Sequence, residues 1–277
     1  MFKIISKEEL SIDVIKMTIE APQIAKKARA GQFIVVIIDE KGERVPLTLA
    51  DWDRDNGLIT LIFQKVGFTT RKLGTLNVSD SIQHILGPLG HPTQTSDIVS
   101  VICVGGGVGI AEVYPVSRAF KKAGSRVIGV IGARSKELLI LEDNLRKTCD
   151  ELFITTDDGS YSRKGFVTDV LKELFGVIEK SSQAKYPDLI YAIGPVPMMK
   201  AVADFSRAYN IRTIVSLNPI MVDATGMCGA CRCSVDGKTV FGCVDGPDFD
   251  AHKVDFNELG KRLQLFRQQE QDPRIKK

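Results

Sequence analysis

Four of the six cysteines of this 277-residue chain fall within a window of sixteen residues near its C-terminal end. Asp223 is followed by Cys228 after four residues and by Cys231 after two more, and Cys243 comes twelve positions later. This is the spacing of a plant-type [2Fe–2S] site, C-x4-C-x2-C with a distant fourth cysteine, except that aspartate stands in the first place. The pattern therefore predicts a [2Fe–2S] cluster with these four residues as its metal ligands.

Two alternatives to this ligand set remain open. Cys233 is a spare thiol that could replace Asp223, although it lies in a predicted hairpin strand, two residues past Cys231 on the same face. A four-cysteine zinc site in a non-catalytic binding module is the other alternative. Zinc usually takes two separated C-x2-C pairs, and this chain has one, so the spacing favours iron and sulfur.

Two glycine-containing turns follow predicted buried strands, at the strand ends where open α/β sheets bind ligands. Glycines there allow backbone N–H groups to approach a phosphate at a helix N-terminus, although any tight strand-to-helix turn can look alike. The candidate nucleotide-binding residues are Gly105, Gly106, Gly107, Val108 and Gly109 in the first turn and Gly194 and Pro195 in the second, with Arg134 after an intervening strand.

The N-terminal part offers hydroxyls and backbone amides of the kind that hold a phosphate-bearing cofactor, though many barrel strand ends resemble it. The candidate residues there are Pro46, Leu47, Thr48, Gly67, Thr69 and Thr70. No Ser–His–Asp set and no acid pair occurs, so hydrolysis has little support and no residue is assigned as catalytic.

Three segments must position these residues. Residues 1–95 contain short strand-like runs separated by turn residues, which predicts a small antiparallel barrel. Residues 96–217 alternate five buried strands with helices, which predicts a parallel nucleotide-binding sheet with helices on both faces. Residues 218–277 contain the cysteine loop, a hairpin turning at Asp236-Gly237, and a final helix capped by Asp255. In that helix Leu259, Leu263 and Phe266 form an apolar stripe that either docks a partner or packs on this chain.

Composition narrows the function classes. Hydrophobic residues make up 44% and charged residues 26%, which is typical of globular proteins. The chain has 37 Lys and Arg and 34 Asp and Glu, so its formal net charge is +3. This charge is too small to indicate a nucleic-acid partner. No apolar run approaches the length of a membrane helix, and the start lacks a signal peptide's apolar core, so we expect a cytoplasmic protein without a membrane partner.

This arrangement resembles the ferredoxin–NADP reductase superfamily. Within it, the chain resembles the electron-transfer subunit of dihydroorotate dehydrogenase and the small subunit of NADH-dependent reduced ferredoxin:NADP oxidoreductases. The motifs that carry the resemblance are PLT at 46–48, GFTT at 67–70, GPLG at 87–90, GGGVG at 105–109, TTDDGS at 155–160, GPVPMM at 194–199 and LNPIMVDATGMCGACR at 217–232. The superfamily's flavin motif R-x-[YF]-[ST] would place its arginine at Val45, whereas Arg44 stands one residue earlier. Aspartate in the first ligand position separates the chain from the subunits that use four cysteines.

The resemblance implies FAD between barrel and nucleotide domain, NAD(H) exchanging a hydride with it, and a [2Fe–2S] cluster passing single electrons onward. The implied partner is a large subunit with a second FAD and [4Fe–4S] clusters, through which ferredoxin and NADP exchange electrons by flavin-based bifurcation. An electron-transfer subunit for dihydroorotate oxidation is the first alternative. The basic Arg134 would also suit the 2′-phosphate of NADP, but the resemblance assigns NAD(H) to this subunit.

Overall fold

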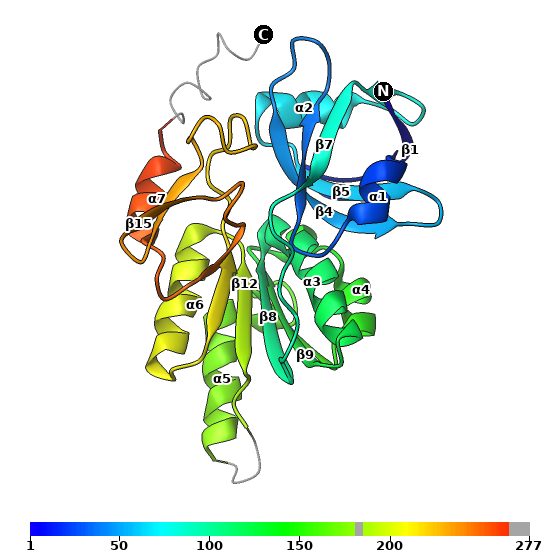
Figure 1. The fold of residues 1–277 in the computed structure, drawn as a ribbon. Coiled ribbons are helices and arrows are strands. Elements are labelled where there is room, and N and C mark those ends of the chain that lie inside the picture. Colours follow the sequence, from blue (N-terminus) through cyan, green and yellow to red (C-terminus); the bar gives the residue numbers. More distant parts are fainter. Residues whose placement is uncertain (181–184, 266–277) are drawn as a thin grey trace. The chain divides into compact units, whose positions relative to one another are not determined.

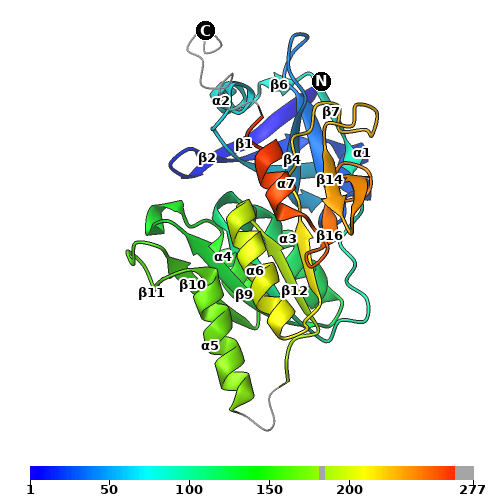
Figure 2. The same cartoon turned by 90° about the vertical axis from the view of Figure 1, so that its left-hand side faces the viewer.

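A computed structural model describes residues 1–180 and 185–265 (Figures 1 and 2). The chain divides into two compact units. The first comprises Met1–Pro92, Leu217–Asp248 and Val254–Lys277, and the second comprises Thr93–Ser216 and Phe249–Lys253. The C-terminal cysteine region is thus grouped with the N-terminal barrel, and the three-part division at residues 95 and 217 stays a prediction.

The first unit is built on an antiparallel sheet. Its strands are β1 (Phe2–Ser11), β2 (Val14–Glu20), β3 (Phe33–Ile37), β4 (Val45–Asp53), β5 (Leu58–Gln64), β6 (Ser81–Ile82) and β7 (His84–Leu89), joined by helices α1 (Pro22–Lys27) and α2 (Phe68–Thr75). They are ordered β6-β1-β2-β5-β4-β3-β7. Because only Gln83 separates β6 from β7, the two edges of the sheet meet and nearly close it into the predicted barrel.

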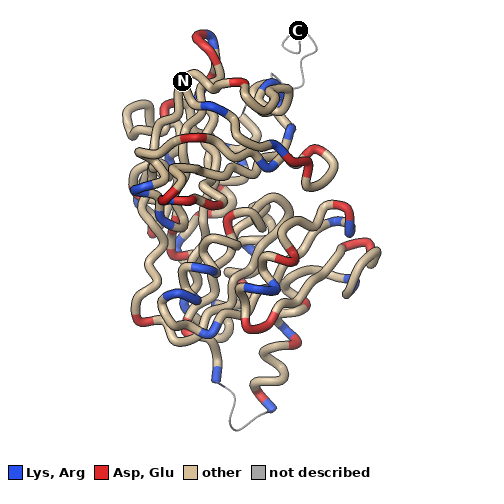
Figure 3. The backbone as a smooth tube through the Cα atoms, turned by 90° about the vertical axis from the view of Figure 1, so that its right-hand side faces the viewer, with Lys and Arg blue, Asp and Glu red and all other residues tan. Residues whose placement is uncertain are grey.

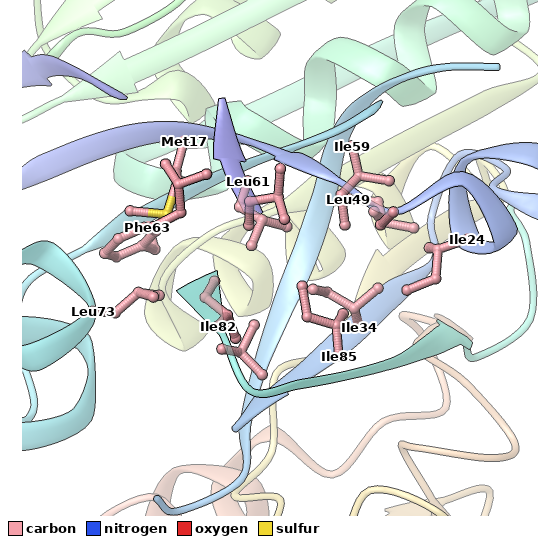
Figure 4. Close-up of a cluster of buried hydrophobic side chains, with 14 of the residues drawn as sticks. Met17, Ile24, Ile34, Leu49, Ile59, Leu61, Phe63, Leu73, Ile82 and Ile85 are labelled. Carbon is pink, nitrogen blue, oxygen red and sulfur yellow. The ribbon is translucent and has the colours of Figure 1, made fainter. Parts of the chain in front are cut away.

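Alternating strand residues fill the barrel. Met17 of β2 pairs with Leu61 of β5, and both are completely buried, whereas Thr18 and Thr60, which pair next to them, are half-buried. Figure 4 shows the cluster, to which α1 contributes Ile24 and α2 contributes Leu73. Burying each such aliphatic side chain stabilises the fold by about 1.5–3 kcal/mol, so this alternation holds the strands that carry the candidate flavin residues.

The second unit is a parallel α/β sheet, as predicted. Its strands are β8 (Ser100–Gly106), β9 (Arg126–Ala133), β10 (Glu151–Thr156), β11 (Arg163–Lys164), β12 (Leu189–Ile193), β13 (Thr213–Ser216) and β16 (Asp248–Asp250), ordered β11-β10-β9-β8-β12-β13-β16. The five predicted strands are parallel neighbours, and the short β11 and β16 extend the two edges. Helices α3 (Ile110–Lys122) and α4 (Glu142–Thr148) cover one face, and α5 (Val167–Glu179) and α6 (Val196–Ala208) cover the other (Figures 1 and 2).

Helices α3 and α4 each have an irregular feature. A 3₁₀ turn, Lys136–Leu138, precedes α4 and is separated from it because Leu141 takes a left-handed conformation (φ 56°) between them. Pro115 lies inside α3. It lacks an N–H, so the hydrogen bond to the carbonyl of Ala111 four residues earlier is missing there.

The C-terminal hairpin and the final helix form where the turn residues and the N-cap residue predict them. Strands β14 (Arg232–Val235) and β15 (Lys238–Phe241) form the predicted hairpin, with positive φ at both Asp236 and Gly237, as a type I′ turn requires. Helix α7 (Phe256–Arg262) is capped by Asp255, whose carboxylate accepts hydrogen bonds from the N–H groups of Asn257 and Glu258 at 2.9 Å. Leu259 of the apolar stripe is buried, and Phe266 lies outside the described residues.

Charged residues of both signs are interspersed along the described chain (Figure 3). Among the described residues, no helix combines the length and the apolar character needed to cross a membrane.

Candidate iron–sulfur and nucleotide sites

The cysteine loop lies against the barrel. Cys231 and Cys243 are both buried, with their sulfurs 3.1 Å apart, in a cluster with Phe33 and Val35 of β3 and with Ala224 of the loop. The hairpin β14–β15 brings Cys243 back beside Cys231. The structure therefore joins two of the four predicted ligands as a close pair.

The other two predicted ligands, Asp223 and Cys228, are also neighbours. The exposed Cys228 sulfur accepts a hydrogen bond from the N–H of Ala230 at 3.5 Å and another from the N–H of Asp223. The Ala230 N–H is the largest of several backbone contacts that lower the pKa of the Cys228 thiol, which favours the thiolate that binds metal. The Gly226 N–H is directed at the Cys243 sulfur, although burial dominates there and raises the pKa of Cys243 to about 12.

The grouping of the candidate ligands distinguishes a zinc site from a [2Fe–2S] site. Over residues 1–180 and 185–265, no three His, Cys, Asp or Glu side chains are grouped tightly enough to hold one metal ion. Tetrahedral zinc needs all its ligands at one centre, whereas a [2Fe–2S] cluster takes two ligands on each of two irons. Two pairs, with loop N–H groups directed at the sulfurs, fit a two-iron cluster better than zinc.

Cys233 faces a different environment. It is 2% exposed, its thiol lies 3.6 Å from the carbonyl oxygen of Cys231, and burial raises its pKa to about 11. Arg262 and Glu258 of α7 are its charged neighbours, and Arg262 also donates to the carbonyl of Ala230 at 3.0 Å. A buried, protonated thiol that packs toward α7 behaves as a small hydrophobic residue.

Asp223 is held from several sides. Its carboxylate accepts hydrogen bonds from the N–H of Thr225 at 3.0 Å, from the Thr225 hydroxyl and from the guanidinium of Arg44. The Thr225 hydroxyl contributes most to lowering the pKa of Asp223. The carboxylate is therefore ionised and oriented, as a metal ligand must be.

The candidate flavin residues lie on β4 and at the start of α2. Pro46, Leu47 and Thr48 are half-buried and pair with β3. Gly67 is the N-cap of α2, where an added Cβ would meet only the Thr70 hydroxyl oxygen, at 3.9 Å. The turn is thus open beside Gly67 and lies at a helix start, where backbone N–H groups can bind an anion such as a pyrophosphate.

The hydroxyls of that turn are engaged within the protein, which sequence reasoning did not anticipate. Thr70 Oγ1 accepts from the Gly67 N–H at 3.0 Å and donates to the Gly67 carbonyl at 3.2 Å. Thr69 Oγ1 donates to Glu43 at 2.9 Å. The backbone, rather than either hydroxyl, is the part of the turn best placed to bind an anion.

The two glycine turns of the second unit lie side by side. A Cβ on Gly106 would come within 3.2 Å of Pro195 Cδ, and one on Gly109 would lie 2.7 Å from the carbonyl oxygen of Ile193. Gly107 instead has φ +57° and no neighbour within 4 Å of an added Cβ. The structure thus packs residues 105–109 against Gly194 and Pro195 and leaves the Gly107 surface open, at the N-terminus of α3.

Arg134 is exposed at the end of β9, and its carbonyl accepts the N–H of Asp158 at 3.2 Å. The motif at residues 155–160 therefore lies beside the candidate Arg134. Sequence reasoning also missed a buried pair: Tyr191 of β12 donates its hydroxyl to Glu112, in the first turn of α3, at 2.9 Å. No motif marks this pair, because its members are 79 positions apart.

Comparison with known proteins places this geometry in a family. Residues 218–255 match the iron–sulfur cluster binding domain of dihydroorotate dehydrogenase B. The Thermotoga maritima homologue of the dihydroorotate dehydrogenase B (NAD(+)) electron transfer subunit is 44% identical, over 97% of this chain and 92% of that protein.

Solved structures agree with this placement. The structure of an NADH-dependent reduced ferredoxin-NADP oxidoreductase, studied for flavin-based electron bifurcation, matches with a TM-score of 0.90 and 44% identity over 97% of this chain and 94% of that chain. Phthalate dioxygenase reductase shares the fold at 17% identity, with a TM-score of 0.62, over 90% of this chain and 94% of that one. The chain therefore belongs to the family of dihydroorotate dehydrogenase B electron transfer subunits and their homologues.

Proposed function

We propose that this chain is the electron-transfer subunit of an electron-bifurcating NADH-dependent reduced ferredoxin:NADP oxidoreductase, with FAD, a [2Fe–2S] cluster and NAD(H) as its cofactors. The observation that carries the proposal is the loop that pairs Cys231 with Cys243 and directs backbone N–H groups at Cys228 and Cys243. The similarity to the bifurcating oxidoreductase over 97% of the chain supports the same activity.

Each part of the chain has a task in this proposal. When bound, flavin exchanges hydride with nicotinamide and single electrons with an iron–sulfur cluster. Asp223, Cys228, Cys231 and Cys243 hold the cluster. Pro46, Leu47, Thr48 and the start of α2 at Gly67, Thr69 and Thr70 hold FAD, with the α2 backbone N–H groups toward its pyrophosphate.

NAD(H) binds to the second unit in this proposal. The turn at residues 105–109 and the N-terminus of α3 receive the pyrophosphate, and Gly194 and Pro195 pack behind that turn. Arg134 provides an exposed positive charge at the end of β9. The partner is a large subunit with a second FAD and [4Fe–4S] clusters, through which the chain exchanges electrons with ferredoxin and NADP.

The test is purification of the full chain, alone and co-expressed with a large subunit of this kind. We expect about two iron atoms and one FAD per chain, an iron–sulfur EPR signal on reduction, and dye reduction by NADH. The complex should reduce NADP when NADH and reduced ferredoxin are both supplied. A colourless protein that contains zinc and no flavin would exclude the proposal.

A second candidate function rests on the dihydroorotate dehydrogenase B similarity. In that case the chain passes electrons between a dihydroorotate-oxidising subunit and NAD. Asp223 in the first ligand place argues against it, because those subunits are expected to use four cysteines. Dihydroorotate-dependent reduction of NAD by the reconstituted complex, without a ferredoxin requirement, would favour this candidate.

A further inference from the structure

Arg44 contacts the cluster loop, although it belongs to the barrel. It directly precedes β4, and 179 positions separate it from Asp223. Its Nη1 donates to the backbone carbonyl of Asp223 at 3.0 Å and to the Asp223 carboxylate. The two side chains are 38% and 22% exposed, so the contact is partly shielded from water.

The loop that carries Arg44 is itself anchored. Glu43 accepts the Thr69 hydroxyl at 2.9 Å, and Asp39 pairs with Lys72, so α2 holds both ends of the segment at residues 39–44. The segment that carries Arg44 is therefore held in place by α2, and from it Arg44 reaches Asp223. Because Thr225 holds the same carboxylate from the loop side, Asp223 is clamped between barrel and loop.

The chemistry of such a contact is electrostatic. A cluster bound by thiolates and a carboxylate gains one further negative charge on reduction. A guanidinium stays positive at any working pH, and a nearby positive charge stabilises the more negative, reduced form. A partly exposed ion pair contributes little to folding stability, so this arrangement matters more for the cluster's charge than for the fold.

On this basis we propose that Arg44 is a positioning residue of the cluster: it orients the Asp223 carboxylate and raises the reduction potential of the cluster. The proposal rests on the proposed function, since it assumes that the loop binds a [2Fe–2S] cluster with Asp223 as a ligand. It adds a residue that lies outside the cysteine motif and outside the superfamily's flavin motif.

The test compares purified full-length Arg44→Gln, Arg44→Lys and Arg54→Gln with the wild type. Arg54 is the matched control, because its guanidinium donates to a backbone carbonyl, that of Ala28 at 3.0 Å, in the same unit. The readouts are iron and FAD content, the EPR spectrum, the urea midpoint of unfolding, and a redox titration of the cluster.

We expect Arg44→Gln to keep its iron and FAD and to lower the equilibrium constant for one-electron reduction about tenfold, which is ~59 mV. Arg44→Lys should recover part of that shift, and Arg54→Gln should show none of it. Loss of iron from Arg44→Gln with unchanged FAD content would also support positioning, since the barrel would still be folded.

Two outcomes overturn the proposal. If Arg44→Gln keeps the wild-type potential and spectrum, or lowers only the urea midpoint, the contact merely ties the loop to the barrel. If Arg44→Gln does not fold, Arg44→Met takes its place, because it also removes the charge, and a wild-type potential and spectrum there would reject the role of the guanidinium. A wild-type protein without any [2Fe–2S] signal would instead reject the proposed function itself.

Discussion

Gly109 offers a sharp test of the nucleotide site, because its environment lacks room for one methyl group. An added Cβ would lie 2.7 Å from the carbonyl oxygen of Ile193 and 3.1 Å from the Cα of Gly194. Both neighbours are backbone atoms at the end of β12, so no side-chain rotation relieves the contact. The φ of Gly109 is −60°, which alanine adopts readily, so any effect of Gly109→Ala is steric.

The size of the effect follows from this geometry. Ordinary contact begins at 3.4 Å, so the two turns must separate by about 0.7 Å. Overpacking of this kind costs about 1–3 kcal/mol in the free energy of unfolding. Moving the α3 N–H groups away from a bound pyrophosphate weakens hydrogen bonds to a charged group, each worth about 1.5–3 kcal/mol. The KM for NADH should therefore rise roughly tenfold to a hundredfold.

Dye reduction with NADH and urea unfolding measure the two effects. Gly176→Ala is the control, because Gly176 lies in α5 with no atom within 4 Å of an added Cβ. It should raise the free energy of unfolding by about 0.8–1 kcal/mol and leave the KM unchanged. A wild-type KM in Gly109→Ala would show that NADH does not bind at this turn. A wild-type urea midpoint would show that the two turns move apart without loss of stability.

Three further substitutions test the other assignments. Gly107→Asn should raise the KM for NADH with little loss of stability, because asparagine tolerates φ +57° and its side chain would project into open space. Gly124→Asn is the control, because Gly124 has φ +93° and equally open surroundings, and it should have a wild-type KM. Gly67→Val should lower the FAD content measured in acid extracts. The urea midpoint of the flavin-free protein should not change, since the protein itself leaves room there, and full FAD content would place the flavin elsewhere. Cys233→Ser should keep the iron content and the EPR spectrum. Its free energy of unfolding should fall by about 1–3 kcal/mol, because the serine hydroxyl is buried. Loss of the cluster would show instead that Cys233 is a ligand.

Features that depend on neighbouring residues were accessible from the sequence. The hairpin follows from Asp236-Gly237, because both positions need positive φ, and the N-cap of α7 follows from Asp255. The parallel strands follow from buried apolar runs that alternate with helices. The close pair of Cys231 and Cys243 could be expected from a hairpin between them.

Features that depend on tertiary contacts were not accessible. The break at Leu141 is a left-handed residue of a type that rarely adopts this conformation, so no local signal marks it. Thr69 was a candidate cofactor contact, and its hydroxyl donates to Glu43, which is 26 positions away in the chain. The contact of Arg44 with Asp223 joins distant parts of the chain and requires the C-terminal segment to pack on β3.

The division of the chain into two units separates the tasks of the proposed enzyme. The candidate flavin residues and the cluster loop belong to the first unit, and the glycine turns belong to the second. A steric change at Gly109 acts within the second unit, so it should change the KM for NADH and leave the cluster potential unaltered. Loss of the Arg44 charge acts within the first unit, so it should shift the potential and leave that KM unaltered. Measuring both quantities on both variants tests the separation, because a potential shift in Gly109→Ala or a KM change in Arg44→Gln would show that the two units are energetically coupled.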